Sequence, residues 1–451
     1  MRIRMCTCAA ALLSCAGAAF GQASFRLITP DEGFDYSVVQ DVSADGTRVL
    51  VSLQNSVPRP TTPFTYVLDL RDNSRQDIID PYGQTINGLA LNADGTVVAG
   101  YLGGGPLAST SAFVWYAEDG ELVEIWGLPA GNIHYATGIT ADGSVVVGSS
   151  GRNFGDPYQQ GWRWTRDGGF VALHCLGEPD VIFSGINGVS DDGSTVVGYG
   201  SSLYVFEDPE EPPEVIYPRG SVWPDGGTVP FELPPMPNPW NGGLEATAVS
   251  ADGSVVVGSG PAFNPSGGFA NHSFRWTADT GVVDLGTIPG RPNASIYAMD
   301  CSADGNTIVG HFNDGGVGTW EAFVWTQADG FRSLRDILAD AGVIIPEDVR
   351  LRETYTSNDG RVIAGWAYVM SENRYYGYVA TLPDDTAPTC PADWDGSGTV
   401  NSTDISAFLT TWLASVTQSN LDADFDGNQA VNSTDISAFL TAWLEAVTNG
   451  C

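Results

Sequence analysis

The stretch Ser250-Ala251-Asp252-Gly253-Ser254-Val255-Val256-Val257-Gly258 is one of seven near-copies along this chain. An Asp-Gly pair between two apolar runs is a strong hairpin signal, because the turn needs positive φ angles that Gly adopts freely and Asp tolerates. The β-branched residues after the turn favour a buried strand. The other copies lie at residues 43–49, 92–100, 140–148, 190–198, 302–310 and 357–365. A repeat of this kind sets the fold.

Each copy is the first hairpin of a longer unit that predicts four antiparallel strands. The unit at residues 135–177 is expected to have strands at 135–140, 144–149, 161–165 and 170–176. In most copies the third strand ends in Trp, and a fourth strand is expected again in later copies, for example at residues 331–338. Four strands per unit, at a period of roughly 50 residues, favour a β-propeller over a β-helix.

The two ends of the repeat region predict how the ring closes. The seventh unit has no fourth strand of its own, whereas residues 25–28 form an apolar strand before the first hairpin. We expect this strand to complete the last blade, because pairing it there removes an open sheet edge. The chain is therefore predicted to be mainly β, with a seven-bladed β-propeller of four-stranded antiparallel blades at residues 24–383. These repeats resemble the HAF extracellular repeats of exported bacterial proteins, a resemblance that implies an architecture and no particular chemistry.

The charge of the chain restricts its partners. It has 54 acidic residues against 19 basic ones, and every basic residue is Arg. Such an excess of negative charge argues against binding to nucleic acid or to an anionic membrane surface. No run of about 18 apolar residues follows the N-terminal segment, so no transmembrane span is expected.

The first 23 residues have the features of a secretory signal peptide. Arg2 and Arg4 precede a short apolar segment, and small residues favour cleavage after Ala23. The alternative is a lipoprotein box at residues 12–15, in which Cys15 carries the lipid. We expect a secreted protein that is held at the cell surface.

Residues 384–389 form a linker, and residues 390–451 form a second, helical domain with two predicted calcium loops. Ca²⁺ takes six to eight oxygen ligands, which such a loop supplies from positions 1, 3, 5, 7, 9 and 12. The first loop would use Asp393, Asp395, Ser397, the carbonyl of Thr399, Asn401 and Asp404. The second would use Asp424, Asp426, Asn428, the carbonyl of Ala430, Asn432 and Asp435. Residues 390–451 contain eight acidic residues and no basic one, so two Ca²⁺ ions should bind in a way that is coupled to folding.

Each loop leads into a predicted amphipathic helix. Apolar residues recur at i, i+3, i+4, i+7 and i+8, which places them on one face. They are Ile405, Phe408, Leu409, Trp412 and Leu413 in the first helix, and Ile436, Phe439, Leu440, Trp443 and Leu444 in the second. We expect the two faces to bury each other.

This duplicated loop-helix unit resembles a dockerin, the module that binds cohesins in cellulosomes. The resemblance implies that a Ser-Thr pair in each half contacts the partner, and the matching residues here are Ser402, Thr403, Ser433 and Thr434. The chain ends in Asn449-Gly450-Cys451, which departs from cellulosomal dockerins and resembles dockerin-like anchors of some exported Planctomycetes proteins. A cohesin-like protein or another surface protein is therefore the expected partner of this domain.

Two cysteines, Cys390 and Cys451, bracket the second domain. A disulfide between them would close a loop of about 60 residues and stabilise the domain by roughly 4 kcal/mol on the chain-entropy model. The alternative is that Cys451 is a point of covalent attachment. Cys175 and Cys301 fall in blades 3 and 6, and we expect them to be buried thiols.

No catalytic motif stands out in the propeller. The repeated Asp is expected to be a turn residue, and the repeated Trp is expected to pack between blades. A ligand of unknown identity is expected on the loops that follow each second strand, opposite the Asp-Gly turns. Candidate residues there are Phe154, Tyr158, Trp240, Phe263, His311 and Trp320. The predicted function is a surface-attached binding or adhesion protein, and the alternative is a secreted hydrolase or lyase that acts on polysaccharide.

Overall fold

The computed structural model divides into two compact units, Met1–Leu382 and Pro383–Cys451, which are considered separately. In the first unit the structure describes residues 23–55, 64–80, 82–103, 109–126, 131–151, 159–176, 184–200, 219–236, 243–263, 268–315 and 319–382. In the second it describes residues 383, 392, 394, 400–418, 423, 425 and 430–449.

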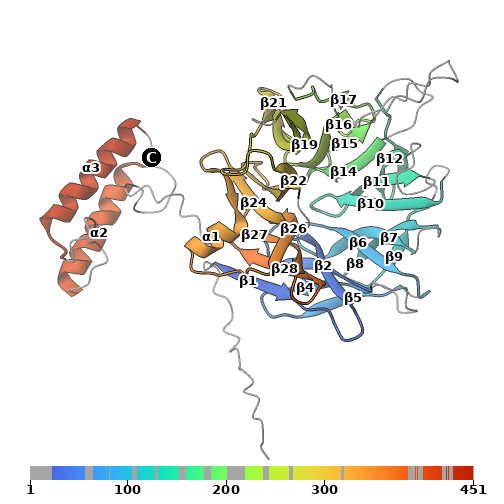
Figure 1. Ribbon diagram of the computed structural model, residues 1–451, viewed down its shortest axis with the longest axis horizontal. Coiled ribbons are helices and arrows are strands. Elements are labelled where there is room, and N and C mark those ends of the chain that lie inside the picture. The colour runs from blue at the N-terminus through green and yellow to red at the C-terminus, as the bar shows by residue number, and fades with distance from the viewer. Residues whose placement is uncertain are drawn as a thin grey trace, which may run out of the picture. The chain divides into compact units, whose positions relative to one another are not determined.

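Within these segments, the strands of the first unit form seven four-stranded antiparallel sheets around a common axis (Figure 1). This confirms the predicted seven-bladed propeller. Blade 1 holds β2 (Tyr36–Val42), β3 (Arg48–Gln54), β4 (Phe64–Asp69) and β5 (Arg75–Ile78), and blade 2 holds β6 (Ile86–Leu91), β7 (Val97–Leu102), β8 (Ser111–Tyr116) and β9 (Leu122–Glu124). Blade 3 holds β10 (Ile133–Ile139), β11 (Val145–Gly151), β12 (Gln160–Thr165) and β13 (Gly169–Ala172), and blade 4 holds β14 (Ser184–Val189), β15 (Val196–Gly200), β16 (Arg219–Trp223) and β17 (Phe231–Glu232). Blade 5 holds β18 (Glu245–Val249), β19 (Val255–Phe263), β20 (Phe269–Thr277) and β21 (Gly281–Asp284), and blade 6 holds β22 (Ser295–Cys301), β23 (Thr307–Asn313), β24 (Trp320–Thr326) and β25 (Gly330–Ser333).

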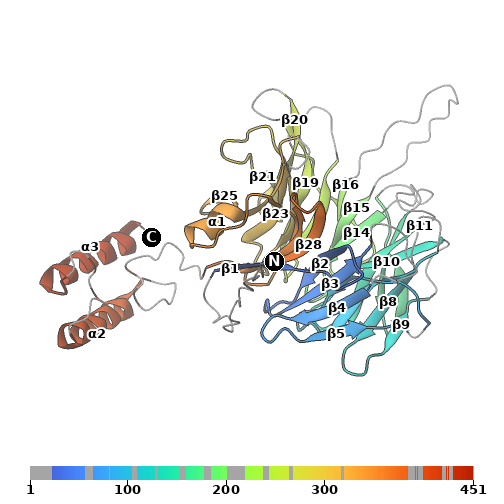
Figure 2. The ribbon, with the colours of Figure 1, turned by 60° about the horizontal axis from the view of Figure 1, so that its bottom comes forward.

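Blade 7 joins the two ends of the propeller sequence. Its strands β26 (Val349–Thr356), β27 (Val362–Val369) and β28 (Arg374–Thr381) are completed by β1 (Ser24–Ile28), which pairs with β28 from Ser24↔Thr381 to Ile28↔Gly377 (Figure 2). The ring of Phe25 stacks on that of Tyr378, with centroids 6.0 Å apart. The N-terminal strand is thus the outer strand of the last blade, as the sequence predicted, and the edge of β28 is covered.

The Asp-Gly turns connect the first and second strands of every blade. In the turn of blade 5, one carboxylate oxygen of Asp252 accepts hydrogen bonds from the hydroxyl of Ser250 at 2.8 Å and the amide of Ser254 at 2.9 Å. The Ser250 hydroxyl in turn accepts the Val255 amide at 2.9 Å. These bonds, led by those from Ser254, hold the pKa of Asp252 below its usual value. The repeated Asp is therefore a turn residue, as predicted.

The turns also bond to one another around the propeller axis. The residue before each Asp donates its backbone N–H to the carbonyl of the same residue in the next blade, at 2.8–3.2 Å. The seven bonds run from Ala44 to Ala93, Ala141, Asp191, Ala251, Ala303, Asn358 and back to Ala44. The ring of blades is therefore closed twice, by β1 at its outer edge and by these bonds at its centre.

The core lies between neighbouring blades. Trp223 of blade 4, for example, is fully buried with Val145 and Val147 of blade 3. Trp115 and Trp164 at the same place in their blades are also buried, whereas Trp276 and Trp325 are partly buried against their clusters. The repeated Trp therefore packs between blades, as expected. Cys175 and Cys301 are both thiols outside any disulfide, as expected, but only Cys301 is buried, whereas Cys175 is half-buried and donates to the Ser184 hydroxyl at 3.5 Å.

One predicted strand is in part a helix. The sequence predicted a strand at residues 331–338, but β25 ends at Ser333 and α1 (Leu334–Asp340) begins there. The reason is the spacing of the apolar residues: Leu334 and Leu338 are both buried, at the i, i+4 spacing of a helix face. The helix lies in the connection between blades 6 and 7.

The second unit contains α2 (Ser402–Gln418) and α3 (Ser433–Asn449), which follow the two predicted calcium loops. Phe408 and Phe439 stack at its centre, with ring centroids 4.2 Å apart and planes at 7°. The helices are linked reciprocally, because the Trp412 indole donates to the Asn432 carbonyl and the Trp443 indole to the Asn401 carbonyl, each at 2.9 Å. The unit therefore has an approximate twofold symmetry.

The prediction that the apolar faces of α2 and α3 bury each other holds only in part. Phe408 and Phe439 are fully buried, but Leu409, Leu413, Leu440 and Leu444 are exposed. Each apolar stripe is wide enough for its Phe to pack inward while its leucines face outward. The leucines lie on a row of the helix surface beside the row that holds the Phe.

Gly46 should be essential to the closure of the propeller. Its φ is +67°, and a β-carbon added there would lie 2.5 Å from Cγ2 of Val362 in blade 7. We expect Gly46→Ala to destabilise the propeller by about 2 kcal/mol or more, through backbone strain and this clash together. Gly281→Ala is the matched control, because φ is +66° but no atom lies within 4 Å, so only about 1 kcal/mol is expected. Urea unfolding of both variants tests this, and equal losses would contradict it.

Candidate functional site

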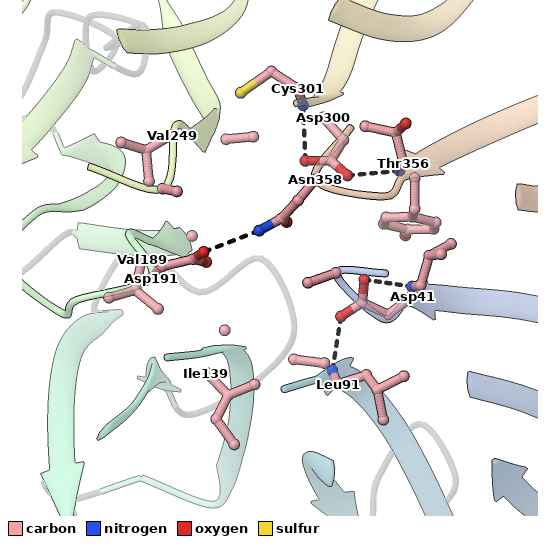
Figure 3. A pocket seen from close by; sticks show the side chains of 18 of the residues that line it. Asp41, Leu91, Ile139, Val189, Asp191, Val249, Asp300, Cys301, Thr356 and Asn358 are labelled. Carbon is pink, nitrogen blue, oxygen red and sulfur yellow. Dashed lines mark hydrogen bonds between the residues drawn. The ribbon is translucent and has the colours of Figure 1, made fainter. Parts of the chain in front are cut away.

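The centre of the propeller encloses a cavity of about 190 Å³, lined by the first strands and the Asp-Gly turns (Figure 3). Alanine is the most frequent residue in its wall. At the turn end, the side-chain amide of Asn358 in blade 7 donates to Asp191 in blade 4 at 3.1 Å. These two residues replace the Ala found at this repeat position in the other five blades, and their bond spans the end of the cavity.

Two half-buried carboxylates lie farther along the cavity. Asp41 in blade 1 accepts the amides of Val42 and of Leu91 in blade 2, both at 2.7 Å. Asp300 in blade 6 accepts the amides of Cys301 and of Thr356 in blade 7, at 2.8 and 2.9 Å. Each carboxylate therefore bonds its own first strand to that of the next blade, as Figure 3 shows.

Burial dominates the electrostatics of these carboxylates. It raises the pKa of Asp41 to about 8 and that of Asp300 to about 7, although the backbone N–H groups that each accepts act in the opposite direction. Because both groups bridge neighbouring blades, their role is structural. Neither carboxylate was predicted from the sequence, although a signal for both is present there: the same repeat position holds Ala, Gly or Tyr in the other blades.

On the opposite face, the structure brings together two of the predicted ligand-binding residues. The rings of His311 (β23) and Trp320 (β24) meet edge to face with centroids 4.9 Å apart, and Tyr297 (β22) lies 5.3 Å from His311. The guanidinium of Arg352 (β26) lies 4.1 Å from the centre of the Trp320 ring and 4.9 Å from that of Trp366 (β27). Arg352 is thus held between two indoles of adjacent blades.

His311 is not placed to act as an acid or base at neutral pH. Burial, helped by the charge of Arg352, lowers its pKa to about 3, so the imidazole is neutral. Its Nδ1 atom is buried and has no hydrogen-bond partner among the described residues. The ring therefore supports Trp320 rather than exchanging protons.

The other predicted residues of this face do not join the cluster. Phe263, at the end of β19, is exposed and instead packs on Phe269 of the same blade, with centroids 4.9 Å apart. Phe154, Tyr158 and Trp240 lie outside the described residues.

In the second unit, the described calcium-loop residues lie at the starts of the helices. Asp404 and Asp435 are fully buried, and one oxygen of each accepts the backbone N–H of Asn401 or Asn432 at 2.8 Å. The side-chain oxygens of Asn401 and Asn432 accept the amides of Thr403 and Thr434, at 2.8 and 2.9 Å. The Ala430 carbonyl accepts from the Asn432 side chain at 2.9 Å. Asn401 and Asn432 therefore cap their helices.

Most of the predicted metal ligands lie outside the described residues. They are Asp393, Asp395, Ser397, Thr399, Asp424, Asp426 and Asn428. The cysteines of the predicted disulfide, Cys390 and Cys451, also lie outside the described residues. Among the residues that are described, no three His, Cys, Asp or Glu side chains are grouped to hold a metal ion. Nor does the described part contain a helix with the length and apolar character needed to cross a membrane.

The comparisons with known proteins concern the propeller. No family model and no curated protein matches this sequence, so neither the HAF repeat nor the dockerin is identified. Among solved structures, the chain is similar to the β-propeller domain of the Trilobed protease from Pyrococcus furiosus, with a TM-score of 0.52 and 12% identity over 79% of this chain and 98% of that one. It is also similar to an oligogalacturonate lyase from Vibrio parahaemolyticus (TM-score 0.49, 14% identity, 81% and 99% covered) and to an acylaminoacyl peptidase from Pyrococcus horikoshii (0.49, 12%, 80% and 55%). At these identities the likeness shows a shared propeller fold alone.

The half-buried carboxylate of Asp41 should make stability depend on pH. Its folded pKa of about 8 lies above the ordinary value of 3.8, so its contribution is full below about pH 4 and is lost as the pH rises toward 8. Asn cannot ionise, so Asp41→Asn should gain stability relative to the native protein, by up to about 1.4 kcal/mol per pH unit between pH 5 and 7. Urea midpoints measured against pH, with the exposed Asp279→Asn as control, test this; parallel profiles for Asp41→Asn and the native protein would refute it.

Proposed function

We propose that this protein is an extracellular binding protein, and that its C-terminal unit docks it to a cohesin-like protein at the cell surface in a Ca²⁺-dependent way. The observation that supports docking best is the pair of exposed apolar stripes on α2 and α3. Leu409 and Leu440 are each 41% exposed, and Leu413 and Leu444 are 63% and 62% exposed. Exposed apolar faces of this kind are typical of interaction sites.

The residues expected to contact the partner lie along the same stripes. On α2, Ser402, Leu409, Leu413 and Val416 recur at helical spacing, and Ser433, Leu440, Leu444 and Val447 repeat the pattern on α3. Ser402, Thr403, Ser433 and Thr434 are all exposed. Each half thus presents hydroxyl groups at the start of its helix and leucines farther along it.

The described residues of the loops fit Ca²⁺. Asp404 and Asp435 are fully buried carboxylates, and residues 390–451 contain no Lys or Arg that could neutralise them. A buried carboxylate needs a counter-charge, and a donor set made of oxygens suits a hard cation. In this proposal the two ions would also offset the mutual repulsion of the eight acidic residues.

The charge of this unit restricts its partner. Because its only charged side chains are acidic, the docking surface of the partner should be apolar at its centre and neutral or basic around it. Docking of this kind leaves the loop face of the propeller to bind a second ligand, which is the adhesive function that we propose.

Calcium should bind with a stoichiometry of two and stabilise the C-terminal unit. Calorimetric titration of the full-length protein is expected to show two sites, and the double variant Asp404→Asn/Asp435→Asn should lose both. The control Asp279→Asn changes one exposed carboxylate of the propeller and should bind as the native protein does. Equal thermal stability of the C-terminal unit in Ca²⁺ and in EGTA would disprove the loop assignment.

Docking should depend on the exposed leucines. With the full-length protein as bait for surface proteins of the source cell, a partner is expected to bind in Ca²⁺ and to be released by EGTA. Leu413→Asp/Leu444→Asp should abolish its capture, because a charge would be buried at the centre of the interface. Val229→Asp, at an apolar residue of the propeller that is also exposed, is the control and should have no effect. Capture that persists in EGTA or in the double variant would rule out docking through these stripes.

A further inference from the structure

We propose that the propeller binds an acidic sugar chain in a pocket between blades 6 and 7, built by Arg291, Trp320, Arg335 and Arg350. This deepens the proposed binding function by naming a site and a class of ligand. The pocket has a volume of about 410 Å³, and Thr319, Glu321 and Glu347 complete its lining.

The position of the pocket follows from the strand order. The connections from second to third strand, and from each blade to the next, lie opposite the Asp-Gly turns, because the strands alternate in direction. Arg335 belongs to α1, and Glu347 lies in the segment that joins α1 to β26. Among the described connections between blades, the one that forms this pocket carries a helix.

Arginine is unusually concentrated here. The whole chain has 19 basic residues against 54 acidic ones, yet three guanidinium groups line this one pocket. Arg335 is fixed in place: it donates to the Glu321 carboxylate at 3.3 Å and to the carbonyls of Ile345 and Val349 at 2.8 and 2.6 Å. A fixed guanidinium loses little entropy when it binds a carboxylate or a sulfate.

The other two arginines are also positioned by neighbours. Arg291 forms an ion pair with Asp314 and lies 5.2 Å from the centre of the Phe312 ring. Arg350 donates to the Glu347 carbonyl at 2.5 Å. Neighbouring groups therefore hold both side chains at the pocket.

Glu321 gives a ligand a further polar group. Its second oxygen, Oε1, is buried and accepts no hydrogen bond from the described residues. Burial raises the pKa of this carboxyl, although Arg335 and two other arginines act against the rise. An unsatisfied buried oxygen is costly, and a hydroxyl group of a sugar could satisfy it.

Trp320 provides an aromatic surface beside these charges. Its ring is held by Arg352 at 4.1 Å and by His311 at 4.9 Å, so its orientation is fixed. The C–H face of a sugar ring packs on such a surface at little entropic cost. The guanidinium groups can bind a carboxylate or a sulfate, the Glu321 carboxyl can accept a sugar hydroxyl, and the Trp320 indole can pack on a sugar ring. Together they match a sugar that carries a carboxylate or a sulfate.

Calorimetry of the full-length protein in 0.15 M salt, which screens its net charge, tests the site with three tetrasaccharides: galacturonate, sulfated galactose and neutral galactose. At least one acidic tetramer is expected to bind about tenfold more tightly than the neutral one. Whether galacturonate or sulfated galactose binds more tightly identifies the anionic group. Equal binding of all three, or of none, would overturn the proposal.

Variants locate the site. Arg291→Gln and Arg350→Gln should each weaken binding of the acidic tetramer about tenfold, since each removes one charged hydrogen bond. Arg219→Gln is the matched control: Arg219 in β16 pairs with Glu232 and occupies the position that Glu321 occupies in β24. Binding that is unchanged in the pocket variants, or equally reduced in Arg219→Gln, would refute the site.

Trp320→Phe, which keeps an aromatic ring, should retain more affinity than Trp320→Ala, and equal losses would exclude stacking.

Surface docking is measured on the same variant proteins. Loss of sugar binding with docking intact separates this site from the C-terminal unit, so either proposal can fail alone. Breakdown of the tetramer during titration would overturn simple binding and favour the enzyme alternative.

Discussion

Seven backbone hydrogen bonds around the propeller axis are the constraint on which the rest of the molecule depends. Each joins the turn of one blade to that of the next, and the bond from Asn358 to Ala44 closes the circle. The donor must lie close to the axis, which explains why the residue before the repeated Asp is Ala in five blades. Where a longer side chain stands there, as in Asp191 and Asn358, it reaches across the cavity to the other.

Features that repeat were predictable from the sequence. Seven copies of the Asp-Gly turn gave the number of blades, and the missing fourth strand gave the closure by β1. The Gly at the end of the repeated motif also has a physical cause. In blade 5, a β-carbon on Gly258 would lie 2.0 Å from the carbonyl oxygen of Glu245 in the neighbouring strand. A pattern that each blade needs for the same reason is visible without a structure.

Features that occur once were not predictable. The helix α1 follows a strand signal that also fits the other blades, and only the burial of Leu334 and Leu338 distinguishes it. The stacking of Arg352 between Trp320 and Trp366 joins residues of three different strands, so no local pattern marks it. In the C-terminal unit, periodicity identified the apolar stripes but not that Leu413 and Leu444 face outward, because that depends on how the two helices pack.

The pairing of β1 with β28 also affects the order in which the chain can fold. Ser24 of β1 lies opposite Thr381 of β28, so β1 must wait for β28 before it has a partner. Strand β1 is thus synthesised before the other strands of the propeller but is among the last to be fixed. Contacts over such sequence separations make folding slow. Until residue 381 is available, the last blade lacks its outer strand and the ring of blades cannot close.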